Sequence, residues 1–401
     1  MPTTRKKILC TWELGGDLGH VSRLAGLARE LLQRGFEVTV ALKDLSRCHG
    51  FFADMDINLM QAPVWLPRIS MQRPIACLPD TLLLNGYLEP DPLHALVRGW
   101  RSLFALVQPD LLLCDYSPTA LLASHGSGLP RIQVGTGFSE PATGGPIVDW
   151  RPWPATDGLV ARQEQRVLQT INTVLQRLGA TPLQRLSDLF ATDATFITTY
   201  PEFDLYPDRT GATTYCITRN DQAFGPAVTW PAGNGPRIFA YLKRQHPQLP
   251  LLLEALSRCH ARVFAACPDG DAALLQRFTG PNFACSTQLV DLEAAVAEAD
   301  LFVGHGNMGS VTQSLRAGKP LAALPVHLEQ LLTGRQLQQL KLGALVEKID
   351  SADTLAAQLE QWANDPDLHH HAAEFARRHQ ALAAASVSVL LADACDAQVT
   401  R

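Results

Sequence analysis

The sequence predicts an α/β fold built from two consecutive parallel-sheet domains. Short apolar runs of strand length alternate with amphipathic segments of helix length, which is typical of parallel sheets covered by helices. The alternation begins near residue 8, breaks off in a Pro- and Gly-rich stretch at 219–235, and starts again at residue 237. With 401 residues, the chain is long enough for two domains with cores of their own.

The first domain is expected over residues 1–218. Its first predicted helix carries Leu24, Leu27 and Leu31 at helical spacing and stops at Gly35. The expected strands are 8–12, 36–42, 57–61, 111–114, 132–134 and 195–199, and the expected helices are 21–34, 93–107, 119–125, 159–178 and 183–190. A long loop rich in Gly and Pro spans 135–158, and loops of this length in compact α/β domains often serve function.

The second domain is expected over residues 236–375, after a linker at 219–235 that lacks hydrophobic periodicity. Its expected strands are 237–242, 262–266, 283–287, 301–303 and 320–324, and its helices 249–259, 272–278, 292–298 and 309–317. Residues 376–401 form a final helical segment that can pack back on the first domain. The expected architecture is two facing Rossmann-like domains with ligands at the carboxyl ends of their strands.

Composition excludes several classes of protein. Hydrophobic residues make up 46% and charged residues 18%, which excludes a disordered chain or a coiled coil. The formal charge of −5 argues against nucleic acid as a partner. Nine widely spaced cysteines without a C-x-x-C pair indicate a reducing, cytoplasmic setting without a zinc site. No transmembrane segment is expected, because no apolar run of about 18 residues occurs; peripheral membrane contact stays open.

The strongest functional signal is the loop GHGNMGS at 304–310, between a buried strand and a predicted helix. Glycines let a ligand approach the backbone, and a helix N-terminus offers N–H groups and a positive dipole end to an anion. Ser310 adds a hydroxyl and His305 an imidazole, both of which can donate to phosphate oxygens. The pattern predicts a metal-free pyrophosphate site. It also fits a tight strand–helix turn capped by Ser310.

His305-Gly306 through Ser310, followed by Pro325 and Glu329-Gln330, resembles the nucleotide-sugar signature of inverting glycosyltransferases of the glycosyltransferase-B (GT-B) fold. The similarity is to bacterial macrolide, rhamnolipid and UDP-glycosyltransferase-like enzymes, and it is strongest over 299–343. The resemblance implies donor-diphosphate binding by His305, Gly306, Asn307, Gly309 and Ser310. It also implies contacts from Glu329 and Gln330 to hydroxyls of the donor sugar, a task that suits carboxylates and amides.

The sequence departs from the family pattern at several positions. Asn307 replaces a glycine, Lys243 stands in a Gly-Ser position, and Thr333 replaces an asparagine. Lys243 can offer a cation to the diphosphate, or it can be an ordinary surface lysine. The family's nucleobase segment corresponds to 287–291, which lacks Trp here. Backbone groups near Leu289 and Val290 remain as candidates to pair with a pyrimidine edge, so a UDP- or dTDP-linked donor is expected.

A second loop lies at the N-terminus, after the strand at 8–12. Gly16, Gly19 and His20 resemble the Gly-x-x-Gly-His element of the same family, in which the histidine deprotonates the acceptor. Arg23, one helical turn later, fits a Gly-His-x-x-Arg variant. The family pairs this histidine with an aspartate at the position of Asp115, which follows the strand at 111–114. A carboxylate there would orient the imidazole; the alternative is a turn cap.

The same motifs and the acidic and histidine clusters allow other interpretations. The glycines at 15, 16 and 19 do not form G-x-G-x-x-G, although Asp44 resembles a ribose-binding acid, so an NAD-dependent oxidoreductase is not favoured. Acidic pairs at 54–56 and 269–271 lack the context of a metal site. The histidines at 369–371 would point apart on a helix. We therefore expect no metal and no cofactor, the nucleotide sugar being a substrate.

The function predicted from the sequence is an inverting transfer of a sugar from a nucleotide-diphosphate donor. The acceptor is expected to be a small molecule, lipid or glycan of apolar or amphipathic character, received by the 135–158 loop and the apolar stretch around Trp65. His20 would be the general base and Asp115 its partner. The alternatives are a nucleotide-sugar epimerase or hydrolase on the same fold, or a non-catalytic nucleotide-sugar binding subunit.

Overall fold

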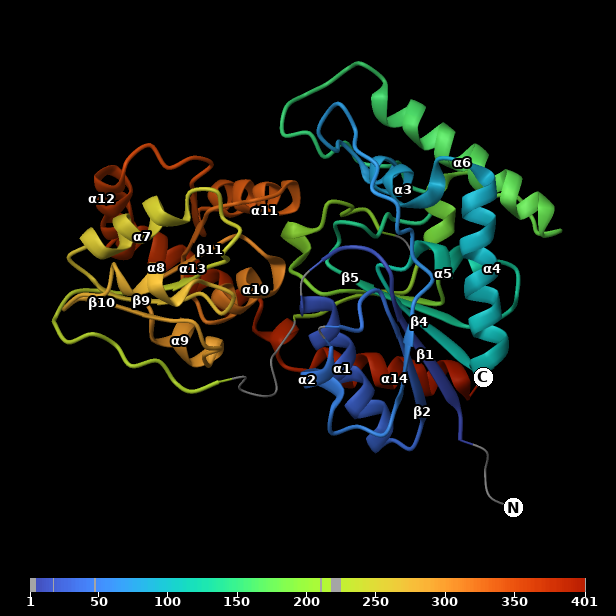
Figure 1. Ribbon diagram of the computed structural model, residues 1–401, viewed down its shortest axis with the longest axis horizontal. Helices are drawn as coiled ribbons and strands as arrows, with labels where there is room; N and C mark the ends of the chain where they lie inside the picture. Colours follow the sequence, from blue (N-terminus) through green and yellow to red (C-terminus); the bar gives the residue numbers. More distant parts are fainter. Residues whose placement is uncertain (1–4, 17, 47, 210, 218–224, 401) are drawn as a thin grey trace. The chain divides into compact units, whose positions relative to one another are not determined.

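The computed structural model describes residues 5–16, 18–46, 48–209, 211–217 and 225–400 (Figure 1). The chain divides into two compact units, Met1–Cys216 with Ala385–Arg401, and Ile217–Ala384. Of the C-terminal segment at 376–401, residues from Ala385 onward therefore belong to the first unit. Of the expected linker, 219–224 lie outside the described residues.

The first unit contains a seven-stranded parallel sheet in the order β3-β2-β1-β4-β5-β6-β7. Its strands are β1 (Lys7–Trp12), β2 (Glu37–Leu42), β3 (Asn58–Gln61), β4 (Leu111–Asp115), β5 (Arg131–Gly135), β6 (Ala194–Ile197) and β7 (Thr213–Tyr215). Its helices are α1 (Leu18–Gln33), α2 (His49–Phe52), α3 (Leu78–Leu82), α4 (Pro90–Val107), α5 (Pro118–Ala123), α6 (Leu159–Arg177) and α14 (Val387–Val399). Short π- and 3-10-helical turns cover Leu83–Tyr87, Leu186–Phe190 and Pro201–Phe203.

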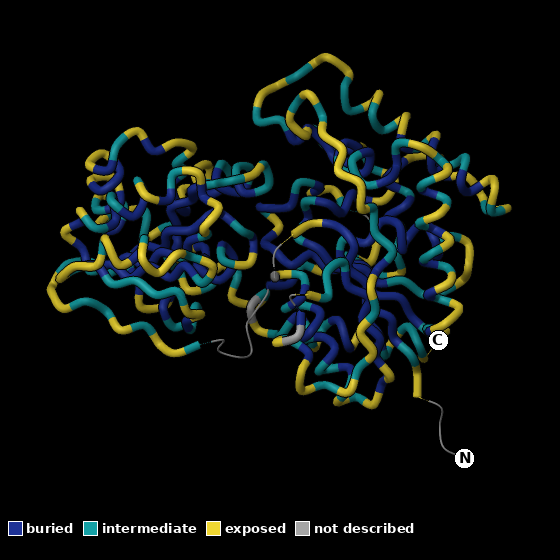
Figure 2. Tube along the Cα trace, in the orientation of Figure 1, coloured by how far each residue is buried: buried dark blue, intermediate teal, exposed yellow. Residues whose placement is uncertain are grey.

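Both faces of this sheet are buried. On one face, Ile8 and Leu113 pack in a core to which α1 and α14 contribute, with Leu391 of α14 fully buried there. Residues of opposite parity, such as Leu9 and Leu112, are also fully buried. Because successive side chains of a strand point to opposite faces, helices and loops must cover both sides. Figure 2 shows the strands as the most continuously buried part of this unit.

The second unit contains a six-stranded parallel sheet in the order β10-β9-β8-β11-β12-β13. Its strands are β8 (Arg237–Tyr241), β9 (Arg262–Ala266), β10 (Phe283–Ser286), β11 (Leu301–Gly304), β12 (Leu321–Ala323) and β13 (Gly343–Leu345). Its helices are α7 (Leu249–Arg258), α8 (Ala272–Gln276), α9 (Leu292–Glu298), α10 (Met308–Arg316), α11 (Leu328–Gln339), α12 (Ala352–Ala363) and α13 (Pro366–Arg378), with a 3-10 turn at Gln380–Ala383. Its core joins β8, β9 and β11 to α7 and α12.

The predicted fold class is confirmed, and the differences from it are local. The expected helix at 183–190 is wrong: only the 3-10 helix Leu186–Phe190 forms. The cause is Asn172, whose side chain bonds both the N–H and the C=O of Leu183 (2.8 and 2.9 Å) and so removes that residue from a helix. The strands β7 and β13, three residues each, were not predicted.

The order of strands reverses once in each sheet, between β1 and β4 in the first and between β8 and β11 in the second. Open α/β sheets bind ligands beyond the carboxyl ends of the strands at such a switch point, because the loops on the two sides diverge there. In the first unit the loops after β1 and β4 meet this condition, and in the second those after β8 and β11. The glycine loop with His20, Asp115, Lys243 and the 304–310 motif lie at these four strand ends, whereas 287–291 follows β10 and Glu329-Gln330 follows β12.

Candidate active site

His20 and Asp115 come together at the switch point of the first sheet. Asp115 is the last residue of β4 and pairs in register with Trp12 of β1, and His20 lies in the first turn of α1. The Nδ1 atom of His20 is 2.7 Å from Oδ1 of Asp115. A proton on Nδ1 then donates to the carboxylate, which leaves the lone pair of Nε2 available as a base.

Arg23 holds the second oxygen of the same carboxylate. Its Nη1 donates to Oδ2 of Asp115 at 2.9 Å, and the Asp115 side chain is fully buried. Burial by itself would raise the pKa of Asp115, but the charges and hydrogen bonds of Arg23 and His20 hold that pKa below its ordinary value. Asp115 therefore stays ionised and orients the imidazole, and the structure brings together all three polar residues predicted for this loop.

The glycine loop shapes the other side of the imidazole. The His20 ring stacks on Trp12, with centroids 5.3 Å apart, and its side chain is 20% exposed. Gly15 has a φ of +84°, and a Cβ there would lie 2.8 Å from Nε2 of His20. A Cβ at Gly16 or Gly19 would meet nothing within 4 Å. The position that requires glycine is therefore Gly15, which the sequence motif did not single out.

Glu13 is a second buried carboxylate that sequence reasoning missed. Its oxygens accept from the backbone N–H groups of Thr119 (2.8 Å) and Ala120 (3.2 Å), so it caps the N-terminus of α5. Burial raises the pKa of Glu13 to about 7, against the opposing effect of these hydrogen bonds. The sequence feature that could have indicated this role is a charged residue placed between an apolar strand and a glycine loop. Glu13 ties the loop after β1 to the helix after β4.

The phosphate-type loop of the second unit connects β11 to α10. Gly306 has a φ of +86°, and a Cβ there would lie 3.0 Å from the carbonyl oxygen of Gln330, so glycine is required. Asn307 is the N-cap residue of α10, but its side chain makes no capping hydrogen bond. A Cβ at Gly309 would meet nothing within 4 Å. The first turn of α10 thus borders open space, as an anion site at a helix N-terminus must.

His305 is held from both sides by the protein. Its Nε2 accepts from the backbone N–H of Lys243 (2.9 Å), and its Nδ1 donates to the carbonyl of Leu324 (3.0 Å). The ring is buried and stacks on His246, with centroids 5.4 Å apart. His305 therefore joins the loop after β8, which carries Lys243, to the loop after β12. Its expected bond to a phosphate oxygen stays a prediction and would require one of these partners to be exchanged.

Gln330 reaches the same loop from α11. Its Nε2 donates to Oδ1 of Asn307 at 2.7 Å, and its Oε1 accepts from the N–H of Val326 at 2.8 Å. The residue is fully buried. Ser310 donates its hydroxyl to the carbonyl of Asn307 at 2.9 Å. The hydrogen bond from Gln330 fixes the side-chain amide of Asn307 with its oxygen toward Gln330. The NH2 group of Asn307, which can donate two hydrogen bonds, therefore points away from Gln330.

The remaining predicted donor residues lie at the start of α11 and in the segment after β10. Glu329 stands in the first turn of α11, and its carbonyl accepts from the Thr333 hydroxyl at 3.0 Å. Leu289 and Val290 lie between β10 and α9; Leu289 is 48% exposed and Val290 is buried. Gly225 packs directly on the backbone of these two residues. Roles for Glu329, Leu289 and Val290 in binding stay predictions.

The two acidic pairs have structural partners. Asp54 accepts from Arg29 at 3.1 Å, Asp271 caps α8, and Asp269 accepts from the N–H of Arg244 at 3.1 Å. Among the residues that the structure describes, no group of three or more His, Cys, Asp or Glu is arranged to hold a metal ion. A search of the same residues found no helix with the length and hydropathy of a membrane span.

No protein-family model matches the chain. Its sequence is 27% identical to a zeaxanthin glucosyltransferase of Pseudescherichia vulneris, over 88% of this chain and 90% of that protein. Its fold matches the solved structure of a kitacinnamycin glycotransferase with a TM-score of 0.75 at 19% identity, over 98% and 99% of the two chains. It also matches the glycosyltransferase VinC, solved in complex with dTDP, with a TM-score of 0.65 at 16% identity, over 98% and 100%.

These similarities define the class of protein. The two parallel-sheet units and their structural neighbours give the chain the GT-B fold. The relatives in sequence are bacterial glycosyltransferases, and they support a glycosyltransferase function for this chain. The family resemblance predicted from the 304–330 segment and from the Gly-x-x-Gly-His loop is thus confirmed.

Proposed function

We propose that this protein is an inverting, metal-independent glycosyltransferase that moves a sugar from a nucleotide-diphosphate donor to a hydroxyl of an apolar or amphipathic acceptor. A donor of the UDP or dTDP type is supported by the dTDP bound to VinC. An acceptor of this class is supported by the zeaxanthin glucosyltransferase among the relatives. The observation that carries the mechanism is the bond between His20 and Asp115 at 2.7 Å, with Arg23 on the second carboxylate oxygen.

In the proposed reaction, Nε2 of His20 removes the proton of the acceptor hydroxyl as the oxygen attacks the anomeric carbon of the donor sugar. One C–O bond forms, the C–O bond to the diphosphate breaks, and the nucleoside diphosphate leaves with the electron pair. Asp115 stabilises the imidazolium that results. A single displacement inverts the anomeric centre, because attack and departure take place on opposite faces.

The donor half of the proposal rests on the N-terminus of α10. The diphosphate would be bound by the backbone N–H groups of its first turn, with the side-chain NH2 of Asn307 as a further donor. Lys243 would bring a cation, and His305 would position the backbone of Lys243. EDTA should leave turnover unchanged. If EDTA abolished the activity and Mn²⁺ restored it, the proposed metal-independent binding of the diphosphate would be contradicted.

The test of the catalytic base is His20→Ala, with His125→Ala as a matched control, since His125 is a half-buried histidine of the same unit that lies beyond α5 and contacts the Thr181 carbonyl. Removal of a general base typically lowers turnover by about 10²–10⁴-fold. Affinity for the nucleoside diphosphate should change little, because its proposed contacts lie in the second unit. Turnover would be measured with a verified donor and acceptor. A His20→Ala rate close to wild type would remove His20 from the mechanism.

Products separate this proposal from its alternatives. An epimerase would yield a new nucleotide sugar without an acceptor, and a hydrolase would release free sugar. A binding subunit would show only a thermal shift with nucleotide sugars. A glycosylated acceptor with inverted anomeric configuration is the expected result.

The role of Gln330 is tested by nucleoside diphosphate without a sugar. If Gln330 orients Asn307, Gln330→Leu and Asn307→Ala should each weaken UDP or dTDP binding by about 3- to 10-fold, the value of one hydrogen bond, and the double variant should be no worse than either. Calorimetric titration of the three variants makes the comparison. Unchanged affinity in Gln330→Leu, with a higher KM for the nucleotide sugar, would assign Gln330 to the sugar instead.

A further inference from the structure

Exposed apolar side chains gather on two loops of the first unit. Among the described residues, eight large hydrophobic side chains are exposed, and four of them belong to the segments 63–75 and 150–158. These four are Leu66 (82% exposed), Trp153 (57%), Ile69 (39%) and Ile75 (36%). Large apolar residues scattered singly need no explanation, but their concentration on neighbouring loops indicates a surface that meets something apolar.

The first of these loops is anchored at both ends. At one end Pro63 packs on Gly99, and Trp65 packs on Gly86, where an added Cβ would lie 3.3 Å from the indole ring. At the other end the fully buried Asp80 carboxylate accepts from Arg73 (2.7 Å to each oxygen) and from the N–H of Ala76 (2.8 Å). Between these anchors, residues 66–70 and 72 are exposed and Met71 is half-buried.

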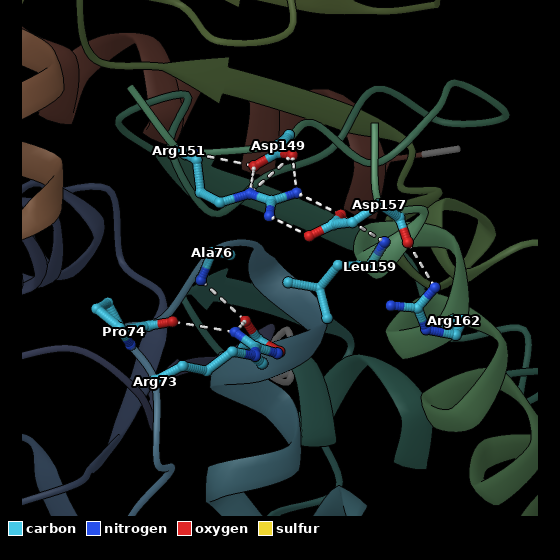
Figure 3. Close-up of polar contacts among 9 residues, drawn as sticks. Arg73, Pro74, Ala76, Asp149, Arg151, Asp157, Leu159 and Arg162 are labelled. Atoms are coloured by element: carbon cyan, nitrogen blue, oxygen red, sulfur yellow. Dashed lines mark hydrogen bonds and ion pairs between the residues drawn. The ribbon is translucent and has the colours of Figure 1, made fainter. Parts of the chain in front are cut away.

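The second loop is fastened beside the first (Figure 3). The N–H of Trp150 donates to the carbonyl of Ala76 at 2.7 Å, and the buried Trp150 ring stacks on Phe138. Arg151 pairs with Asp149, just before the loop, at 2.6 Å and with Asp157, within it, at 2.7 Å, so both carboxylates are joined to a cation. Trp153 lies within the segment that these pairs close.

Two basic residues lie on the first loop. Arg73 is neutralised by its ion pair with Asp80, so Arg68 is the basic side chain that this loop presents to solvent. Arg68 is exposed and stands between Leu66 and Ile69. Exposed Trp, Leu and Ile interleaved with Arg are the composition of segments that lie at the boundary between lipid headgroups and acyl chains. The phosphate of an anionic lipid complements Arg68.

We propose that the two loops, 63–75 and 150–158, form a docking surface for an anionic lipid bilayer. Leu66, Ile69 and Trp153 enter the interface between headgroups and acyl chains, and Arg68 contacts lipid phosphates. The anchors at Gly86, Gly99 and Asp80 present the apolar side chains without a further ordering cost on binding. This inference does not depend on the proposed reaction, because it concerns binding to a surface in the absence of any substrate.

The test is co-sedimentation of the full chain with vesicles of neutral phosphatidylcholine, or of phosphatidylcholine with about 30 mol% phosphatidylglycerol. The variants are Leu66→Ser with Ile69→Ser, and separately Arg68→Gln. Leu106→Ser is the matched control, since Leu106 is 71% exposed on α4, outside the two loops. Thermal unfolding shows that each variant is folded.

The wild type should bind the anionic vesicles more than the neutral ones, and added salt should weaken the binding. The double variant should lose at least about 3-fold in bound fraction, Arg68→Gln should lose less, and Leu106→Ser should match the wild type. No binding to anionic vesicles, or equal binding by the double variant, would overturn the proposal. The proposal would also be overturned if sedimentation velocity showed a wild-type dimer and a monomeric Leu66→Ser, Ile69→Ser variant, because a second copy of the chain would then cover the surface. A raised acceptor KM without any change in vesicle binding would assign the loops to the acceptor instead.

Discussion

Two buried carboxylates beside the same glycine loop have opposite properties at the residue scale. Asp115 faces the guanidinium of Arg23 and the imidazole of His20, and its pKa is lowered. Glu13 has neutral hydrogen-bond partners, the backbone N–H groups of Thr119 and Ala120 and the side chains of Thr119 and Trp100, and burial raises its pKa to about 7. Burial disfavours both charges, and only a nearby cation reverses the result. The ionised Asp115 orients the imidazole of His20, whereas Glu13 connects the loop after β1 to the helix after β4.

The raised pKa of Glu13 predicts a pH-dependent stability. The folded state binds the Glu13 proton more tightly than the unfolded state does. The contribution of Glu13 to the free energy of unfolding is therefore largest below about pH 4 and falls as the pH rises to about 7, above which it stays constant. Across this interval the free energy of unfolding falls by about 3 kcal/mol. Glu13→Gln removes this term, so the free energy of unfolding of the wild type relative to the variant should fall across that interval.

Urea unfolding at several pH values measures this difference. The control is Glu37→Gln, an exposed carboxylate at the start of β2. A difference between wild type and Glu13→Gln that stays constant from pH 4 to pH 8 would contradict the raised pKa.

At the scale of elements, α10 and the loop before it contain two glycines, Gly306 and Gly309, and the fold requires glycine at the first position only. Gly306 is required by its positive φ and by the nearby Gln330 carbonyl. Gly309 lies in the first turn of α10 beside open space, where the fold itself would accept a larger residue. If the diphosphate lies against this turn, the reason for glycine at 309 is the ligand.

Alanine substitutions should separate these two reasons. Gly306→Ala should lower the free energy of unfolding by about 1–3 kcal/mol, the usual cost of such backbone strain. Gly309→Ala should leave stability unchanged or raise it by up to about 1 kcal/mol, because alanine is the better helix former. The same change should nevertheless weaken UDP or dTDP binding in calorimetry. Unchanged nucleotide affinity in Gly309→Ala would move the diphosphate away from this turn.

At the scale of the whole molecule, the last helix of the chain belongs to the first unit. Leu391 and Cys395 of α14 are fully buried in the core that includes α1. Arg34, which follows α1, pairs with Asp393 and Asp396, each at 2.7 Å. The first unit therefore cannot complete its core until the second unit's sequence has been synthesised.

Leu391→Ala should destabilise the first unit selectively. Deletion of a fully buried leucine side chain costs about 2–5 kcal/mol. In scanning calorimetry the transition of the first unit should move to lower temperature, while that of the second unit, and binding of nucleoside diphosphate, should be retained. Val389→Ala is the control, because Val389 is 37% exposed on the same helix. An equal shift in both transitions would show that the units unfold together.

The sequence by itself determined the two-sheet α/β class, most of the strands, and the loops that carry His20 and the 304–310 motif. These features depend on periodicity and on motifs within a few residues of the chain, which are visible in one dimension. Glycines at 16 and 19 marked the N-terminal loop, although the position under conformational constraint is Gly15.

Only the tertiary structure decided which of these residues meet and which atoms remain available. His20 and Asp115 are 95 residues apart, and the β1–β4 pairing joins them. Gln330 is 23 residues from Asn307, and its side-chain amide donates to the Asn307 side chain; the contact with the donor sugar that the resemblance implies stays a prediction. Both ring nitrogens of His305 are bonded within the protein. Hydrogen-bond partners across strands and loops depend on long-range packing, and local sequence patterns do not encode the direction in which a buried polar group finds its partner.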